Sequence, residues 1–221
     1  LIQTGSASRS GDIVVSPGKA LSSGAGIRAV SGHSTYNTGG AIELRSGGSA
    51  FSEGGRVKIA SPESTEGSSG VIDVSTGDSV YSSGSVAIRS GTSIEGEVGF
   101  VAFEAGKGHA EGGSVVIKSG SSESFSGGDL LLKSGSSKES DGGEISIKSG
   151  TSRVGSSGKI SAITGTSDEG NSGDLEFSTG SASSGKSGKL KMMTGLSTVG
   201  ESGSISLTVG QSSSTESQGG D

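Results

Sequence analysis

The side chains that could do chemistry are few and far apart in this 221-residue chain. It has two histidines, His33 and His109, and no cysteine, whereas catalysis needs several polar groups converging in one concave site. No serine stands on a strand-to-helix Gly-x-Ser-x-Gly turn, and strings such as 200–203 are repeat corners. Glycine pairs such as Gly54-Gly55 lack the Lys-Ser/Thr of a phosphate-binding loop. We therefore predict that the protein is not an enzyme and holds no cofactor.

Acidic side chains could instead hold a cation. Repeating calcium sites place aspartates at fixed positions of each Gly-rich corner. Here Asp12, Asp129, Asp141 and Asp174 occur sporadically and never as repeating ligand sets. The sequence therefore predicts no metal site, with a solitary surface site near Asp141 and Glu144 as the open alternative.

The elements that would have to position any site are short tandem repeats. The motif Gly-x-Φ-x-Φ-x-Ser/Thr-Gly, where Φ is apolar, recurs every 14 or 15 residues. Alternation of apolar and polar residues is typical of a strand with one buried face, and most Φ residues are β-branched or aromatic, which favours strands. The residues predicted to form the core are Ile42, Leu44, Val57, Ile59, Val86, Ile88, Val115, Ile117, Leu130, Leu132, Ile145 and Ile147.

The second arm of each repeat is rich in serine and glycine. A small residue, nearly always Ser, stands two positions after the closing glycine, which indicates a crowded position. Glycine corners then precede the next apolar segment and are expected where the backbone needs unusual angles or a close approach. The repeats 19–32, 78–91 and 107–120 are shortened in this arm alone.

These features predict an all-β fold, a β-solenoid (β-helix or β-roll) with one 14–15-residue repeat per coil. About 14 coils would stack, because a single coil buries too few apolar side chains to offset its ordering entropy. The two histidines would then lie roughly 24 Å apart by strand spacing. The alternative pairs successive repeats as antiparallel hairpins, with the Ser/Gly arm as a long loop.

The repeats run without interruption, so residues 1–221 form a single continuous array. Neither end carries a capping repeat, and uncapped solenoid ends expose strand edges. We expect the array either to be a window of a longer repeat protein or to polymerise end to end.

Composition narrows the function classes. The chain contains 44 glycines and 28% hydrophobic residues, which excludes an ordinary core of packed helices. A net charge of -6 provides no basic surface for nucleic acid or anionic lipid. No apolar run approaches the roughly 20 residues of a membrane-spanning helix. We expect no nucleic-acid partner and no membrane insertion.

Outward-facing columns of the predicted solenoid are the candidate contact surfaces. A strip of apolar residues would mark lateral contact with another chain; it comprises Ala87, Phe100, Ala102, Val116 and Leu131. A ladder of lysines would either be a solvated charge ladder or contact a polyanion such as an acidic polysaccharide; it comprises Lys118, Lys133 and Lys148. Ranked threonines and serines around closing glycines, as at Thr164 and Thr166, make an ice-binding protein a further alternative.

Strings such as 172–180 and 202–207 resemble the Ser/Gly-rich tandem repeats of very large cell-surface or secreted structural proteins and adhesins. The resemblance covers the whole chain and implies an extracellular or cell-surface, non-enzymatic protein. The expected function is that of a structural component of an extracellular filament, surface appendage or matrix, assembled laterally or end to end. Its expected partners are other copies or other chains of the fibre, and polysaccharide. The alternatives are ice binding and a glycan-binding adhesin.

Overall fold

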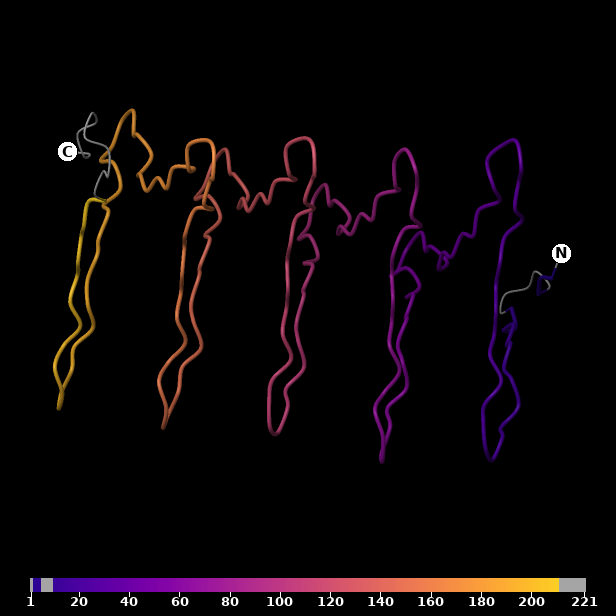
Figure 1. Ribbon diagram of the computed structural model, residues 1–221. Coiled ribbons are helices and arrows are strands. Elements are labelled where there is room, and N and C mark those ends of the chain that lie inside the picture. Colours follow the sequence, from indigo (N-terminus) through magenta and orange to yellow (C-terminus); the bar gives the residue numbers. More distant parts are fainter. Residues whose placement is uncertain (1, 5–9, 211–221) are drawn as a thin grey trace. The chain divides into compact units, whose positions relative to one another are not determined.

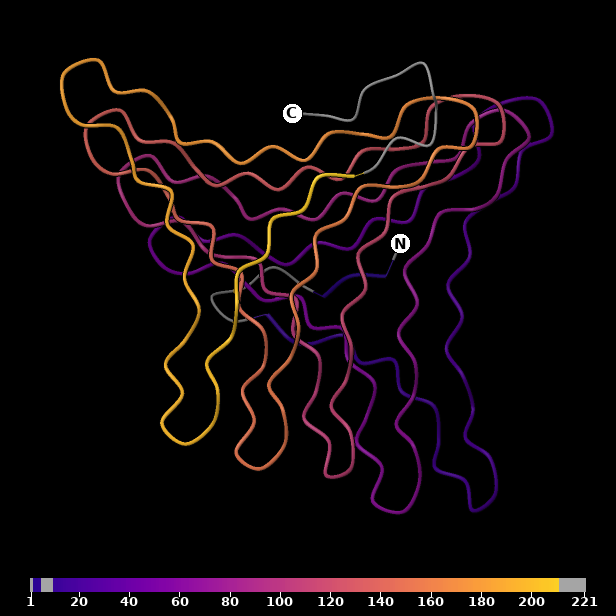
Figure 2. The same cartoon turned by 60° about the vertical axis from the view of Figure 1, so that its left-hand side comes forward.

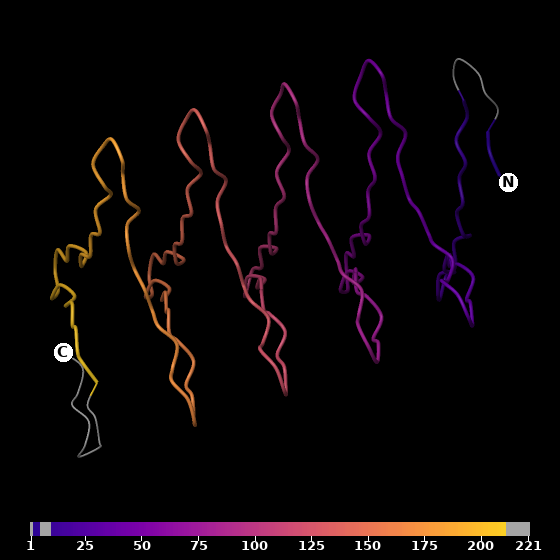
Figure 3. The ribbon, with the colours of Figure 1, turned by 90° about the horizontal axis from the view of Figure 1, so that it is seen from above.

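The computed structural model describes residues 2–4 and 10–210. Within these residues the chain forms no α-helix and no β-strand, and its trace is drawn throughout without coils or arrows (Figures 1 and 3). The predicted all-β fold, a β-solenoid with one repeat per coil, is therefore wrong for this chain. The expectation that the array has no capping repeats concerns residues 1, 5–9 and 211–221, which lie outside the described residues.

The described residues form no strand because their backbone hydrogen bonds close loops and do not pair one extended segment with another. In the described residues, the backbone–backbone bonds join positions seven or eight residues apart within one loop, and none joins one loop or one apolar segment to another. A sheet requires a neighbouring segment about 4.8 Å away along its whole length. The β-branched residues keep the apolar segments extended, but extension without a neighbour does not make a strand.

The chain divides into two units, Leu1–Val115 and Val116–Asp221. The division falls inside one apolar segment, between Val115 and Val116, and the 14- or 15-residue period continues across it. The boundary falls within the shortened repeat 107–120, and the repeats that follow it all have 15 residues.

The Ser/Gly arm of each described repeat forms a loop in which the chain turns back on itself (Figure 2). In six repeats the amide N–H of the corner glycine donates to the carbonyl oxygen of the preceding closing glycine, over N···O distances of 2.7–2.9 Å. The pairs, donor first, are Gly40 and Gly32, Gly55 and Gly47, Gly113 and Gly106, Gly128 and Gly120, Gly143 and Gly135, and Gly158 and Gly150. Each bond closes the neck of one loop.

Bends recur at the tips of these loops with the period of the sequence. They lie at 21–22, 35–37, 50–52, 65–67, 80–81, 94–96, 109–111, 123–125, 138–140, 153–155, 168–170, 183–185 and 198–200. The shortened repeats lose their residue in these loops, so the loop absorbs the length change and the apolar segments keep their register.

Several corner glycines are required by close approach and none by unusual backbone angles, whereas others, such as Gly128 and Gly99, have room for a Cβ. A Cβ on Gly113 would lie 3.0 Å from the Ala105 Cβ and 3.2 Å from the Gly106 nitrogen. The same crowding meets Gly40, whose Cβ would lie 3.1 Å from the Gly32 nitrogen. No described residue has a positive φ, so only the close-approach half of the expectation is confirmed.

No described residue is buried, so this part of the chain has no core. The twelve residues predicted to be core are between 54% and 75% exposed: Ile42, Leu44, Val57, Ile59, Val86, Ile88, Val115, Ile117, Leu130, Leu132, Ile145 and Ile147. They were expected to be covered by the next coil, and that coverage is absent because successive repeats do not stack on one another.

The solvent-accessible surface area of a single copy lies between the values for a compact protein and for an extended chain. The chain exposes 23225 Å², whereas a compact monomer of 21.3 kDa exposes roughly 9000 Å² and its extended chain roughly 31000 Å². A single copy thus covers about a quarter of its extended surface, against about 70% for a typical domain of similar size.

Candidate functional site

The apolar columns are the most regular feature of the exposed surface. Side chains of the first column, such as Ile72 at 51% and Ile145 at 54%, are about half exposed, and those of the second column, such as Leu44 at 75%, are more so. Apolar residues at the loop tips, such as Phe51, are almost fully exposed. The chain's own backbone therefore shields one face of each apolar segment only in part.

In unit Val116–Asp221, a groove lies between two successive apolar segments. Its volume is about 480 Å³, and it is lined by residues 131–134 on one side and 144–147 on the other. The loop between them is closed by the Gly143 N–H donating to the Gly135 carbonyl at 2.9 Å. Because that loop returns the chain, the two segments run past the groove in opposite directions. The hairpin alternative expected two antiparallel strands joined by a long Ser/Gly loop. The loop is present here, but the two segments beside it do not pair as strands.

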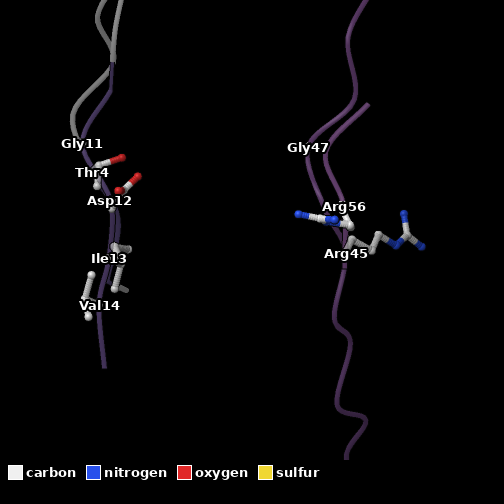
Figure 4. Close-up of a pocket in the computed structure, with 8 residues that line it drawn as sticks. All are labelled: Thr4, Gly11, Asp12, Ile13, Val14, Arg45, Gly47 and Arg56. Carbon is white, nitrogen blue, oxygen red and sulfur yellow. The ribbon is translucent and has the colours of Figure 1, made fainter. Parts of the chain in front are cut away.

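In unit Leu1–Val115, a larger cavity of about 1020 Å³ lies between segments three repeats apart. We call it the slot. One wall is formed by Thr4 and the segment 11–14, the other by Arg45, Gly47 and Arg56. Asp12 and Arg56 each precede the first apolar residue of their repeats. Their side chains are directed toward one another across the slot (Figure 4).

An ion pair lies beside the slot. The Arg45 guanidinium contacts the Glu43 carboxylate, and both side chains are largely exposed. The two residues flank Leu44 and so lie on the same side of an extended segment. An exposed pair of this kind contributes about 0.2–1 kcal/mol, too little to hold the segment in place by itself.

The residues of the predicted lateral strip are all exposed. Phe100 is 90% exposed, Val116 83% and Leu131 82%, and Ala87 and Ala102 are also exposed. The first unit contains Ala87, Phe100 and Ala102, and the second contains Val116 and Leu131. Of these residues, Leu131 lines the groove of the second unit.

The three lysines of the predicted ladder, Lys118, Lys133 and Lys148, lie exposed in the second unit. Lys133 lines the groove together with Glu144, so one lysine has an acidic side chain on the opposite wall. The ice-binding alternative required a flat face of paired strands, and the described residues contain no strand that could provide one.

The other candidate groups remain apart. His33 lies in the loop 32–40 and His109 in the bend 109–111. Among the described residues, no three His, Asp or Glu side chains come together in a way that could hold a metal ion. That part of the chain also has no helix long and apolar enough to cross a bilayer.

The serine that stands two positions after most closing glycines stabilises the turn of its loop, a role that the small size of the side chain did not indicate. In nine loops the serine hydroxyl accepts a hydrogen bond from the backbone N–H three residues later, over 2.9–3.1 Å. One example is the Phe125 N–H donating to Ser122 Oγ at 3.0 Å. Serine preferences for such local turns were the available signal. The expected crowding is found at Gly108, where a Cβ would overlap the Glu111 carbonyl oxygen.

No protein-family model, curated protein or solved structure matches this chain. The slot, the groove and the exposed apolar columns therefore have to be interpreted from their own chemistry.

Proposed function

We propose that the protein is a non-enzymatic structural component of an extracellular filament, surface appendage or matrix, and that its repeats are assembly elements. In this proposal the apolar columns are contact surfaces that other chains cover. The loops act as hydrated spacers between them. Assembly is lateral, along the columns, and the array supplies one such surface per repeat.

The observation that carries the proposal is the periodic exposure of the apolar columns. A single copy exposes 23225 Å², about 14000 Å² more than a compact monomer of this mass. A stable protein–protein interface buries about 1200–2000 Å², so the excess would serve several interfaces. Removing apolar surface from water contributes about 25 cal/mol per Å², so covering the apolar part of this surface favours association.

Sedimentation velocity over a wide concentration range tests the proposal. We expect the mass to rise with concentration, and electron microscopy of the concentrated sample to show assemblies. Ile145→Asp should reduce the association, because the charge would have to be desolvated where Ile145 contacts another chain. Ser146→Asp is the matched control, since it adds the same charge at the adjacent position, outside the apolar columns.

In the isolated chain Ile145 is 54% exposed, so Ile145→Asp should leave the neighbouring loop closed. The Gly143 amide, which donates to Gly135, reports this by its hydrogen exchange. A wild-type chain that stays monomeric at every concentration would contradict the proposal. So would equal association by the Ile145→Asp and Ser146→Asp variants.

A further inference from the structure

The two walls of the slot in unit Leu1–Val115 are formed by equivalent parts of two different repeats. Asp12 and Arg56 occupy the same position of repeats three apart, and each precedes an apolar segment that begins at Ile13 or Val57. Ile13 and Val57 are both 54% exposed. The slot is thus bounded by two copies of one structural element, separated by a cavity of about 1020 Å³.

The backbone of the two walls is not paired across the slot, and one wall has a bond of its own, from the Gly55 N–H to the Gly47 carbonyl oxygen at 2.7 Å. No backbone hydrogen bond of the described residues joins 11–14 to 45–56. Unpaired N–H and C=O groups along an extended segment form a template for another extended chain. Side-chain chemistry alone therefore does not define what enters the slot; the entering group must also supply a row of backbone donors and acceptors.

The charges of the walls are opposite. The carboxylate of Asp12 lies on one wall and the guanidinium of Arg56 on the other (Figure 4). An entering segment that carries an acid or a base at this position can pair with the wall of opposite charge. The repeats of the chain supply both kinds of segment, because Asp12-Ile13 carries the acid and Arg56-Val57 carries the base.

From these observations we propose that the slot is occupied by an apolar segment of a second copy of this chain, so that copies interleave between segments three repeats apart. This inference rests on the proposed function and specifies its partner and its contact. The second copy supplies backbone hydrogen bonds to both walls, covers Ile13, Val14 and Val57, and places its own Asp12 or Arg56 beside the opposite charge.

A charge-complementation experiment tests this contact. Arg56→Asp places an aspartate at this position on each wall, and Asp12→Arg places an arginine there on each wall. Each variant alone should associate at least tenfold more weakly than wild type in sedimentation velocity, because the entering segment 11–14 or 56–58 then meets its own charge on either wall. A 1:1 mixture of the two variants should regain most of the wild-type association.

The matched control is Glu66→Arg, which reverses a charge in the bend 65–67 of the same unit. It should associate like wild type and should not complement either slot variant. Hydrogen exchange of the wild-type chain provides a second measurement. On association, the amides of residues 12–14 and 56–58 should become protected, whereas those of the bend 65–67 should not.

The outcomes separate the two proposals. If the wild-type chain associates but both slot variants associate equally well and gain nothing on mixing, interleaving is wrong and the assembly proposal stands. Association without protection of 12–14 and 56–58 also overturns interleaving. If the wild-type chain does not associate, both proposals fail.

Discussion

The loop 106–113 permits a test in which the repeat pattern and the structure predict opposite results. In most repeats, the second residue after the closing glycine is serine, and in this shortened repeat it is Gly108. Judged by the pattern alone, Gly108→Ser restores the preferred residue and its turn-forming hydroxyl. In the structure, a Cβ on Gly108 would overlap the Glu111 carbonyl oxygen and lie 2.8 Å from the Glu111 carbonyl carbon.

The loop has no room to absorb that overlap, because its neck is closed. The Gly113 N–H donates to the Gly106 carbonyl oxygen at 2.9 Å. We expect Gly108→Ser to open the neck and lose this hydrogen bond, which contributes about 0.5–1.5 kcal/mol. The Gly113 amide should then exchange roughly 2- to 13-fold faster with solvent, as that free energy converts to an equilibrium constant.

Amide exchange measured by NMR on the isolated chain is the assay, with the Gly128 amide of a neighbouring closed loop as the internal reference. Gly106→Ser is the matched control, since nothing lies within 4 Å of a Cβ there. Adding one glycine after Ala110 in the Gly108→Ser chain gives the loop the nine residues of the longer repeats and should restore protection. Slower exchange at Gly113 in Gly108→Ser, or equal acceleration by Gly106→Ser, would refute the steric explanation.

Three further predictions follow from the same local contacts and from the open surface. Ser122→Ala should accelerate exchange of the Phe125 amide roughly fivefold, for a hydrogen bond of about 1 kcal/mol, while Ser121→Ala should not; equal effects would exclude the hydroxyl as the acceptor. Gly143→Ala, whose Cβ would lie 3.3 Å from the Gly135 nitrogen, should weaken the neck of its loop, whereas Gly135→Ala, with nothing within 4 Å, should leave the Gly143 amide protected. Urea titration of the dilute chain followed by circular dichroism should show a slope well below the usual 1–3 kcal/mol per molar, because little surface is left to expose, and a steep transition would show that a single copy has a core.

The local part of the structure was predictable from the residues. The period of 14 or 15, the placement of length changes in the Ser/Gly arm, and the close approach at the corner glycines are all present in the structure. These features depend on contacts within about nine residues, such as the bond from Gly143 to Gly135. The composition of a single loop is sufficient to encode them.

The arrangement of the repeats was not predictable in the same way. Alternation at Ile145, Ser146 and Ile147 indicates that one face of the segment favours burial, but it does not say whether the next repeat, a later repeat or another chain covers that face. The predicted solenoid, with one repeat per coil, required the next repeat to cover that face. Because all repeats share one pattern, the sequence contains no signal that distinguishes neighbours one repeat apart from neighbours three apart.

Sequence alone therefore determined the unit of construction: an extended apolar segment followed by a glycine-closed loop whose bend is usually held by a serine hydroxyl. Only the tertiary structure decided that Asp12 faces Arg56 from three repeats away, across a cavity of about 1020 Å³, and that the apolar columns of a single copy remain exposed. The physical reason is the range of the interactions. Loop closure is a hydrogen bond between residues seven or eight positions apart, whereas burial of a column depends on which distant backbone lies alongside it.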